Sequence, residues 1–383
     1  MESERHAPVA YPYQKVEGPS RRWTLNGDFL SLGTSGIARY GRQTALALDT
    51  LIGIRHPLTR HLAIDLVARS VPSDFYLRNI AIRIVPEWLP IPQLWTQLQL
   101  PHQISGGLVS LSNLAPLLVS KHIVCIHDVQ TRSVPGSYDI GFRLAHRAIL
   151  PLLGRRARAV TTVSEASRSL LDFYSVAKSA KTVVTYNGSD HTTQWESYKA
   201  TLKFTSARPF ILGFAHPRPY KNAELFWKIA ARLKARNIDI VLVGNPPPEF
   251  TRNGAALPAN MRMLGSVSDA DLALAMENAL CLLLPSRTEG FGLPAVEAMA
   301  RGCPIIVSTA QSLPEVCGNA ALFADPNRPD EWLTAVDRLI DPQTPVRTQM
   351  IALGLEQAKL YTWQSVAETY LRLMSDIDSE SRT

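Results

Sequence analysis

Hydrophobic and polar positions alternate along this chain in a pattern typical of parallel α/β proteins. From about Arg22 onward, short apolar or β-branched runs are followed by longer segments in which apolar residues recur at helical spacing. Runs such as "HIVCIHD" (122–128) and "AVTTVSE" (159–165) resemble buried strands that end in polar residues. The pattern therefore predicts parallel sheets covered by helices, and such sheets bind ligands at the carboxyl ends of their strands.

The alternation is interrupted once. Residues 191–207 ("HTTQWESYKATLKFTSA") are polar and unpatterned, which indicates a linker, and the pattern then restarts with "PFILGFA" as a strand. A chain of 383 residues also exceeds what one hydrophobic core usually serves. We therefore expect two Rossmann-like doubly wound domains, residues 1–200 and 201–365, facing each other across a cleft. Residues 366–383 form a helix and tail that can pack back on the first domain, while residues 1–20 and the tail "DSESRT" are expected to be disordered.

Composition and charge narrow the functional classes. The net charge of +7 and the pI near 9.3 favour an acidic partner, which includes nucleic acid, an anionic membrane surface or a phosphorylated small molecule. The four cysteines lack CxxC spacing and lie mostly in apolar runs, so we expect buried thiols. No apolar run approaches the ~20 residues of a membrane span, and the first residues lack an apolar signal region, so we expect a cytoplasmic protein.

The stretch "PSRTEGFGLPAVE" (285–297) carries two glutamates, Glu289 and Glu297, around a Gly-Phe-Gly turn. We expect a helix to begin just after this turn, because the proline there suits a first helical turn. Amide groups at the helix start favour a phosphate, and Gly290 and Gly292 allow a ligand to approach the backbone. Carboxylates on both sides of a phosphate suit the hydroxyl groups of a nucleotide sugar. The alternative is an exposed Glu289 with Glu297 as an ordinary first-turn carboxylate.

The longer stretch "EGFGLPAVEAMARGCPIIVS" resembles the "EGFGLPxxEAMAxGxPVV" motif of family 4 of the retaining glycosyltransferases. The following "SLPEV" and "ALFADPNRPDEW" resemble that family's next segments, and four further stretches agree in order and spacing. The resemblance extends from about Asn26 to Met374. It implies the two-domain GT-B fold, with a nucleotide sugar donor on the C-terminal domain and the acceptor on the N-terminal one.

The resemblance also implies roles for residues of the second half. Glu289 would bind hydroxyl groups of the transferred sugar and Glu297 the ribose, while Lys221 of "GFAHPRPYKN" would clamp the donor diphosphate and offset its developing charge. His216 occupies the position of the family's usual arginine, so either Arg218 or a protonated His216 would replace it. The other donor-binding candidates are Gly36, Gly244, Leu264, Gly290, Phe291, Gly292 and Leu293.

Three N-terminal stretches resemble the family as well. "LGTSGIARYG" resembles its "GGIGRY" segment, which places Gly36 near the diphosphate and Arg39 facing the cleft. "IHD" puts His127 at a predicted strand end, where the family has a histidine near the reacting sugar, and Asp128 would orient this imidazole or contact the acceptor. "VVTYNGSD" resembles "VxxNGVD", so we interpret Asn187 as a cleft or hinge residue. The alternatives are a plain helix start and a structural histidine.

Two other classes of protein fit the sequence less well. No GxGxxG follows a strand with an acidic residue about 20 positions later, which argues against a nicotinamide-dependent oxidoreductase. The basic stretch "GFRLAHRAILPLLGRRAR" (141–158) interleaves arginines with Leu, Ile and Phe, which favours an anionic membrane surface over nucleic acid. Its alternative is a solvated basic helix face.

These observations predict a retaining hexosyltransferase of surface polysaccharide biosynthesis. No DxD motif follows a strand, so we expect neither a metal site nor a cofactor. GDP-mannose is the first candidate donor, ahead of UDP-hexoses, and the acceptor would be a glycan or a polyprenyl-diphosphate-linked sugar. The protein would bind peripherally to the inner face of the cytoplasmic membrane.

Overall fold

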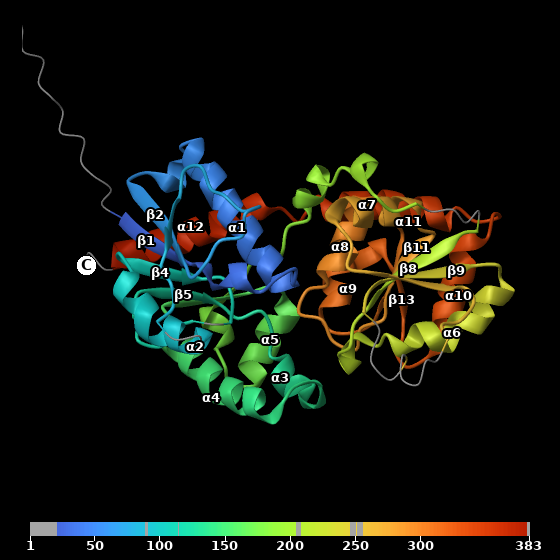
Figure 1. Cartoon of the computed structure of the whole chain (residues 1–383), viewed down its shortest axis with the longest axis horizontal. Coiled ribbons are helices and arrows are strands. Elements are labelled where there is room, and N and C mark those ends of the chain that lie inside the picture. The colour runs from blue at the N-terminus through green and yellow to red at the C-terminus, as the bar shows by residue number, and fades with distance from the viewer. Residues whose placement is uncertain are drawn as a thin grey trace, which may run out of the picture.

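The computed structural model describes residues 21–380 apart from 89–90, 114, 204–207, 246–249 and 251–255. The disorder expected for residues 1–20 lies outside the described residues. Two α/β units lie side by side, each with its own parallel sheet (Figure 1). The predicted fold class, two Rossmann-like parallel-sheet domains, is confirmed.

The first sheet has seven strands, all parallel. In spatial order they are β3 (Ala81–Ile84), β2 (Leu62–Ala68), β1 (Arg21–Asn26), β4 (Gly107–Ser110), β5 (His122–Cys125), β6 (Ala159–Thr162) and β7 (Thr182–Val184). Its helices are α1 (Gly36–Gly53), α2 (Pro92–Leu94), α3 (Gln130–Ser133), α4 (Ile140–Arg156) and α5 (Glu165–Phe173). Strands β4, β5 and β6 are buried throughout, as their uninterrupted apolar runs predict.

The second sheet has six parallel strands. In spatial order they are β10 (Met261–Gly265), β9 (Asp239–Gly244), β8 (Phe210–Ala215), β11 (Cys281–Leu284), β12 (Ile305–Ser308) and β13 (Leu322–Ala324). Its helices are α6 (Glu224–Ala235), α7 (Asp269–Asn278), α8 (Leu293–Ala300), α9 (Ser312–Cys317), α10 (Pro329–Ile340) and α11 (Val346–Ala358).

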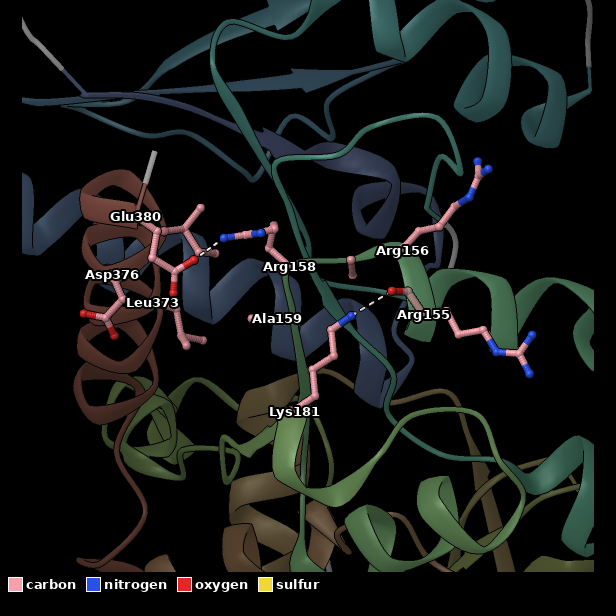
Figure 2. Close-up of a pocket in the computed structure, with 10 residues that line it drawn as sticks. Arg155, Arg156, Arg158, Ala159, Lys181, Leu373, Asp376 and Glu380 are labelled. Carbon is pink, nitrogen blue, oxygen red and sulfur yellow. Dashed lines mark hydrogen bonds and ion pairs between the residues drawn. The ribbon is translucent and has the colours of Figure 1, made fainter. Parts of the chain in front are cut away.

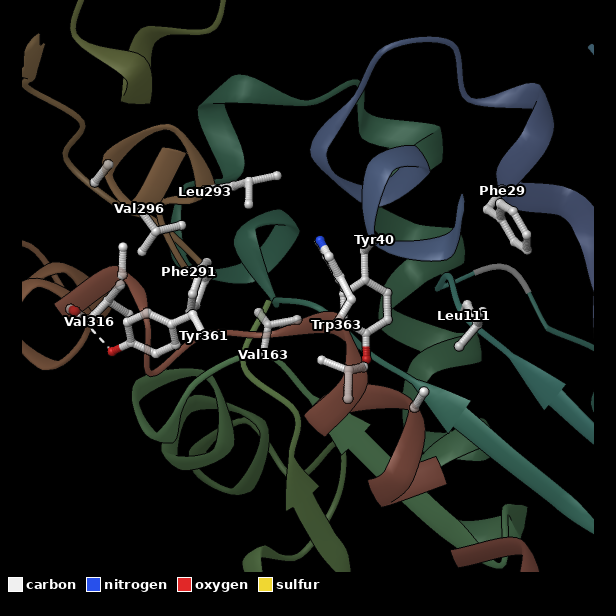
Figure 3. Close-up of a cluster of buried hydrophobic side chains, with 14 of the residues drawn as sticks. Phe29, Tyr40, Leu111, Val163, Phe291, Leu293, Val296, Val316, Tyr361 and Trp363 are labelled. Atoms are coloured by element: carbon white, nitrogen blue, oxygen red, sulfur yellow. Dashed lines mark hydrogen bonds between the residues drawn. The ribbon is translucent and has the colours of Figure 1, made fainter. Parts of the chain in front are cut away.

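Each sheet separates two layers of side chains because neighbouring residues of a strand face opposite sides. In β5, Ile123 and Cys125 join the core that includes residues of α1, whereas Val124 packs with residues of α4 and α5. One apolar cluster continues from the first domain into the second (Figure 3). It includes Tyr40 of α1, Phe291 of the second domain, Tyr361 just before the last helix and Trp363 at the start of that helix. The two domains are therefore joined by a continuous core.

The last helix, α12 (Trp363–Glu380), returns from the second domain and packs on α1 of the first (Figure 1). Its end corrects the expectation of a disordered "DSESRT" tail, because residues 378–380 are helical. Asp378 is buried and accepts hydrogen bonds from Arg21 Nε at 2.6 Å and Trp23 Nε1 at 3.1 Å. Ion pairing to strand β1 thus orders a segment whose composition is typical of a solvated tail.

The connection between the sheets is also more ordered than its polar sequence predicts. A short 3-10 helix spans Asp190–Gln194, and both His191 and Trp195 are buried. Among the described helices, none combines the length and the low polarity that a membrane span requires.

Candidate active site

The glutamate loop, residues 285–292, connects the end of β11 to the start of α8. Gly292 has φ of +95°, a conformation that favours glycine, and a Cβ there would lie 2.5 Å from Leu313 Cδ2. The loop turns the Glu289 side chain inward, where it is buried. Its Oε1 accepts hydrogen bonds from Lys221 Nζ at 2.8 Å and from Ser286 Oγ at 2.7 Å.

Lys221 ends the short helix Pro219–Lys221 that follows β8. Because β8 and β11 are neighbours in the sheet, their carboxyl ends bring this lysine and Glu289 together. The sequence placed both residues at a donor site. The structure adds that they form an ion pair.

The loop before Lys221 contains His216, which occupies the position of the family's usual arginine, and Arg218, which is the alternative cation. His216 Nδ1 accepts the backbone N–H of Arg218 at 3.1 Å, and burial together with the positive charges of Lys221 and Arg218 lowers the pKa of His216. His216 thus supports the loop through this hydrogen bond, and the Arg218 guanidinium stacks on the Tyr138 ring of the first domain, 4.4 Å from its centroid. These contacts favour Arg218 as the second cation of the site.

Glu297 lies one turn into α8 and is 4% exposed. Its Oε1 lies 3.0 Å from His191 Nε2 and 3.5 Å from Arg39 Nε. Arg39 comes from α1 of the first domain and also donates two hydrogen bonds to Asp269 of the second, at 2.8 and 3.2 Å. Burial opposes its charge, but Asp269 and Glu297 hold the pKa of Arg39 above its ordinary value. Arg39 thus joins the two domains beside the second glutamate.

His191 was missed by the sequence reasoning, which treated it as part of a polar linker. The family-like "NGSD" stretch just before it was a usable signal, since the structure shows that this stretch holds the start of α12. Asp190 Oδ1 accepts the backbone N–H of Trp363 at 2.9 Å, and a Cβ on Gly188 would lie 2.4 Å from the same nitrogen. Asn187, predicted as a cleft or hinge residue, is 5% exposed in this segment.

His127 lies at the end of β5, as predicted, but its imidazole is turned into the first domain. Its Nε2 lies 3.0 Å from the Leu111 carbonyl oxygen, and its ring packs edge-on against Tyr40. Leu111, rather than Asp128, therefore holds this ring nitrogen, and Asp128 Oδ1 accepts the Gln130 N–H instead. A contact between His127 and a sugar stays a prediction.

The backbone at His127 does reach the donor loop. A Cβ added to Gly290 would lie 3.2 Å from the His127 carbonyl oxygen. The Gly290 carbonyl also accepts hydrogen bonds from Ser164 and Ser167 at 2.6 and 3.1 Å, while the first two N–H groups of α5 donate to Glu315. These two serines therefore attach the glutamate loop to the first domain.

The remaining predicted donor residues are distributed as follows. Gly36 is the first residue of α1, with open space around it, and Gly244 ends β9 with φ of +96°. Leu264 is half-buried in β10, and Leu293 begins α8. Phe291 was expected to contact the donor, but its side chain is 3% exposed. Its ring packs against that of Tyr361, with the ring centroids 5.5 Å apart (Figure 3). Only the backbone of Phe291 can therefore contact a ligand.

A basic recess of about 540 Å³ lies away from the glutamate loop, where α4 ends and α12 ends (Figure 2). Arg158 forms an ion pair with Glu380, and Lys181 Nζ donates to the carbonyl oxygens of Gly154 and Arg155 at 3.0 and 2.9 Å. Two of the cations in this recess thus already have partners, a carboxylate for Arg158 and carbonyl oxygens for Lys181. In the part of the chain that the structure describes, no cluster of three or more His, Cys, Asp or Glu side chains could hold a metal ion.

The sequence is similar to those of known glycosyltransferases. Residues 196–356 match the family of glycosyl transferases group 1. The chain is 41% identical over 105 residues to O-antigen chain mannosyltransferase B of Escherichia coli, which is 27% of each chain. It is 33% identical over 157 residues to MMP alpha-(1->4)-mannosyltransferase of Mycolicibacterium hassiacum, which is 39% of this chain and 38% of that protein. The matched segments thus span less than half the length of these relatives.

Solved structures share the fold over nearly the whole chain. Sucrose-phosphate synthase from Thermosynechococcus elongatus superposes with a TM-score of 0.69 at 18% identity, covering 94% of this chain and all of that one. WaaG, a glycosyltransferase involved in lipopolysaccharide biosynthesis, superposes with a TM-score of 0.65 at 12% identity, covering 92% and 99%. Residues 196–356 therefore match the group 1 glycosyl transferases, and both domains together have the GT-B fold.

Proposed function

We propose that this protein is a retaining glycosyltransferase that moves a hexose from a nucleoside diphosphate to an acceptor hydroxyl group. One observation carries the proposal: the ends of β8 and β11 place Lys221 against Glu289, and Glu297 follows one turn into the next helix. A lysine paired with the first of two glutamates on one loop and helix suits a diphosphate that links a sugar and a ribose.

The proposed reaction leaves no covalent bond to the protein. The acceptor oxygen attacks the anomeric carbon on the face that the diphosphate leaves, and the electron pair of the broken bond stays on the phosphate oxygen. That oxygen takes the proton of the acceptor hydroxyl group, so the anomeric configuration is retained. Lys221 and Arg218 would stabilise the charge that develops on the leaving group.

Identification of the sugar anomer tests this mechanism. A nuclear magnetic resonance spectrum of the first product formed should show the anomeric configuration of the donor. An inverted product, or a glycosyl adduct that accumulates on Glu289, would contradict the proposal. Neither outcome depends on which nucleotide the donor carries.

For the donor we propose GDP-mannose, with UDP-hexoses as competitors. The support comes from the names of two relatives, because O-antigen chain mannosyltransferase B and MMP alpha-(1->4)-mannosyltransferase are similar to this chain over part of their length. A thermal-shift screen against GDP, UDP and ADP separates the candidates, because a ligand at ~100 times its dissociation constant adds ~2.7 kcal/mol of stability. Stabilisation by UDP or ADP alone would exclude GDP-mannose.

For the acceptor we propose a glycan or a polyprenyl-diphosphate-linked sugar presented at an anionic membrane surface. Helix α4 supports this, because its outward face carries an apolar row with Ile140 and Leu144 about 60% exposed and Leu152 42% exposed. Arg155 and Arg156 follow at the end of the helix and are exposed. Apolar residues with flanking arginines suit the headgroup boundary of a bilayer.

Vesicle binding tests the membrane proposal. Binding to anionic vesicles should be clear at low salt, fall steeply as the salt concentration rises, and weaken when Arg155, Arg156 and Arg158 are changed together to glutamine. Arg158 is paired with Glu380, so Arg155 and Arg156 should account for most of the loss. Equal binding by the wild type and the triple variant would refute it and leave the transferase proposal standing.

A further inference from the structure

The carboxylate of Glu297 is held by a histidine from the segment between the two sheets. His191 is 4% exposed, and its Nε2 lies 3.0 Å from Glu297 Oε1. Its other ring nitrogen, Nδ1, lies 3.0 Å from the indole Nε1 of Trp363. An indole N–H can only donate, so Nδ1 must be the acceptor. A neutral imidazole then carries its hydrogen on Nε2, and this N–H points to Glu297.

Packing fixes the ring as well as its tautomer. The imidazole meets Trp195 edge-on with ring centroids 5.3 Å apart, and Trp363 lies 5.8 Å away on another side. Trp363 is itself anchored, since its backbone N–H donates to Asp190. His191 therefore has little freedom to turn away from the carboxylate.

We propose that His191 is a positioning residue for nucleotide recognition, which holds Glu297 in the orientation that accepts hydroxyl groups of a ribose. Both contacts that described residues make with this carboxylate, from His191 and from Arg39, involve Oε1. Oε2 is then the oxygen available to a ligand. The inference rests on the proposed function, in which Glu297 binds the ribose.

The surroundings explain why an N–H donor is needed at this point. Arg39 shares its guanidinium between Glu297 and the closer carboxylate of Asp269, at 3.5 and 2.8 Å. It therefore leaves the Glu297 carboxylate incompletely satisfied. A buried carboxylate without good partners is costly and would turn toward another donor. The histidine supplies the short hydrogen bond that Arg39 does not.

The test compares nucleotides with and without ribose hydroxyl groups. The full chain is titrated by calorimetry with whichever of GDP, UDP and ADP stabilises it, and with the matching 2′,3′-dideoxy nucleotide. Hydrogen bonds to a charged carboxylate should make the wild type prefer the ribose form by about tenfold to a hundredfold. A residue with a merely structural role would change both affinities by the same factor.

Two amide substitutions form a matched pair. His191→Gln can place an amide N–H near the position of the imidazole Nε2 and should keep most of the preference. His191→Asn can still accept a hydrogen bond from Trp363, but its side chain ends one bond short of Glu297. This variant should therefore bind the ribose nucleotide at most about threefold more tightly than the dideoxy nucleotide. His122→Asn is the control, because His122 is also buried but hydrogen-bonds Ser110 within the first domain, and its preference should equal that of the wild type.

The outcomes separate this inference from the proposed function. If His191→Asn keeps the wild-type preference, or His191→Gln loses as much as His191→Asn, the positioning role is wrong. If the wild type binds no nucleotide, the proposed function itself fails and the inference falls with it. Thermal melts check that each variant folds, and His191→Leu replaces His191→Asn in the comparison if the latter does not.

Discussion

Replacing Lys221 by methionine should separate the contribution of this lysine to catalysis from its contribution to stability. Lys221 Nζ lies 2.8 Å from Glu289 Oε1, and the two side chains are 26% and 7% exposed. A preorganised cation at a developing phosphate charge contributes ~3 kcal/mol, so turnover should fall ~100-fold or more. Release of the nucleoside diphosphate from the donor measures this rate.

The same substitution should destabilise the fold by about 1 to 2 kcal/mol. Breaking a fully buried ion pair costs ~3–5 kcal/mol, but solvent reaches this lysine and reduces the effect. After the change, Ser286 remains as a hydrogen-bond donor to the Glu289 carboxylate. Adding Glu289→Gln removes the unpaired charge and should restore most of the stability in urea unfolding, while turnover stays low.

Lys228→Met is the matched control. Lys228 forms a pair of equal length with Glu224 on the surface of α6, where both residues are more than 40% exposed. Its loss should change stability by less than ~0.5 kcal/mol and leave turnover unaffected. A folded Lys221→Met protein with near-normal turnover would refute the reasoning, and Arg218 would then be the residue that clamps the diphosphate.

Three further predictions concern a buried histidine, the glycine of the glutamate loop and the need for a metal. Burial lowers the pKa of His122 to about 3, so only the unfolded chain takes up a proton between about pH 3 and 6.5. The stability that neutral His122 contributes is therefore complete above pH 6.5 and is lost as the pH falls below it. The free energy of unfolding in urea should be ~1.4 kcal/mol lower at pH 5.5 than at pH 7.5. His122→Asn should remove that difference. Gly292→Ala should cost ~2 kcal/mol because its φ is +95° and Leu313 lies in the way, whereas Gly36→Ala, with open space around it, should be nearly neutral. Transferase activity should survive EDTA, because the sequence has no DxD motif at the end of a strand; loss of activity that magnesium or manganese restores would contradict the expectation that no metal is needed.

The sequence determined the fold class and which polar residues follow the strand ends. Continuous apolar runs such as "CLLL" at residues 281–284 are typical of strands buried on both faces of a parallel sheet, and β11 is buried throughout. A ligand site at the carboxyl ends of strands follows from that sheet type. The resemblance to the glycosyltransferases assigned Lys221 and Glu289 to one donor site, and the pairing of β8 with β11 in the sheet explains why the two side chains meet.

Tertiary structure alone decided how the second glutamate is held and how the domains are joined. His191 and Glu297 are 106 positions apart, and Arg39 reaches Asp269 over 230 positions. No local periodicity specifies such pairs, because they depend on the relative placement of two sheets and of the returning helix α12. The same reason explains the ordered tail, where Asp378 acquires partners on β1 from the opposite end of the chain. Local spacing specifies which side a residue faces, and only the packed chain specifies what it meets there.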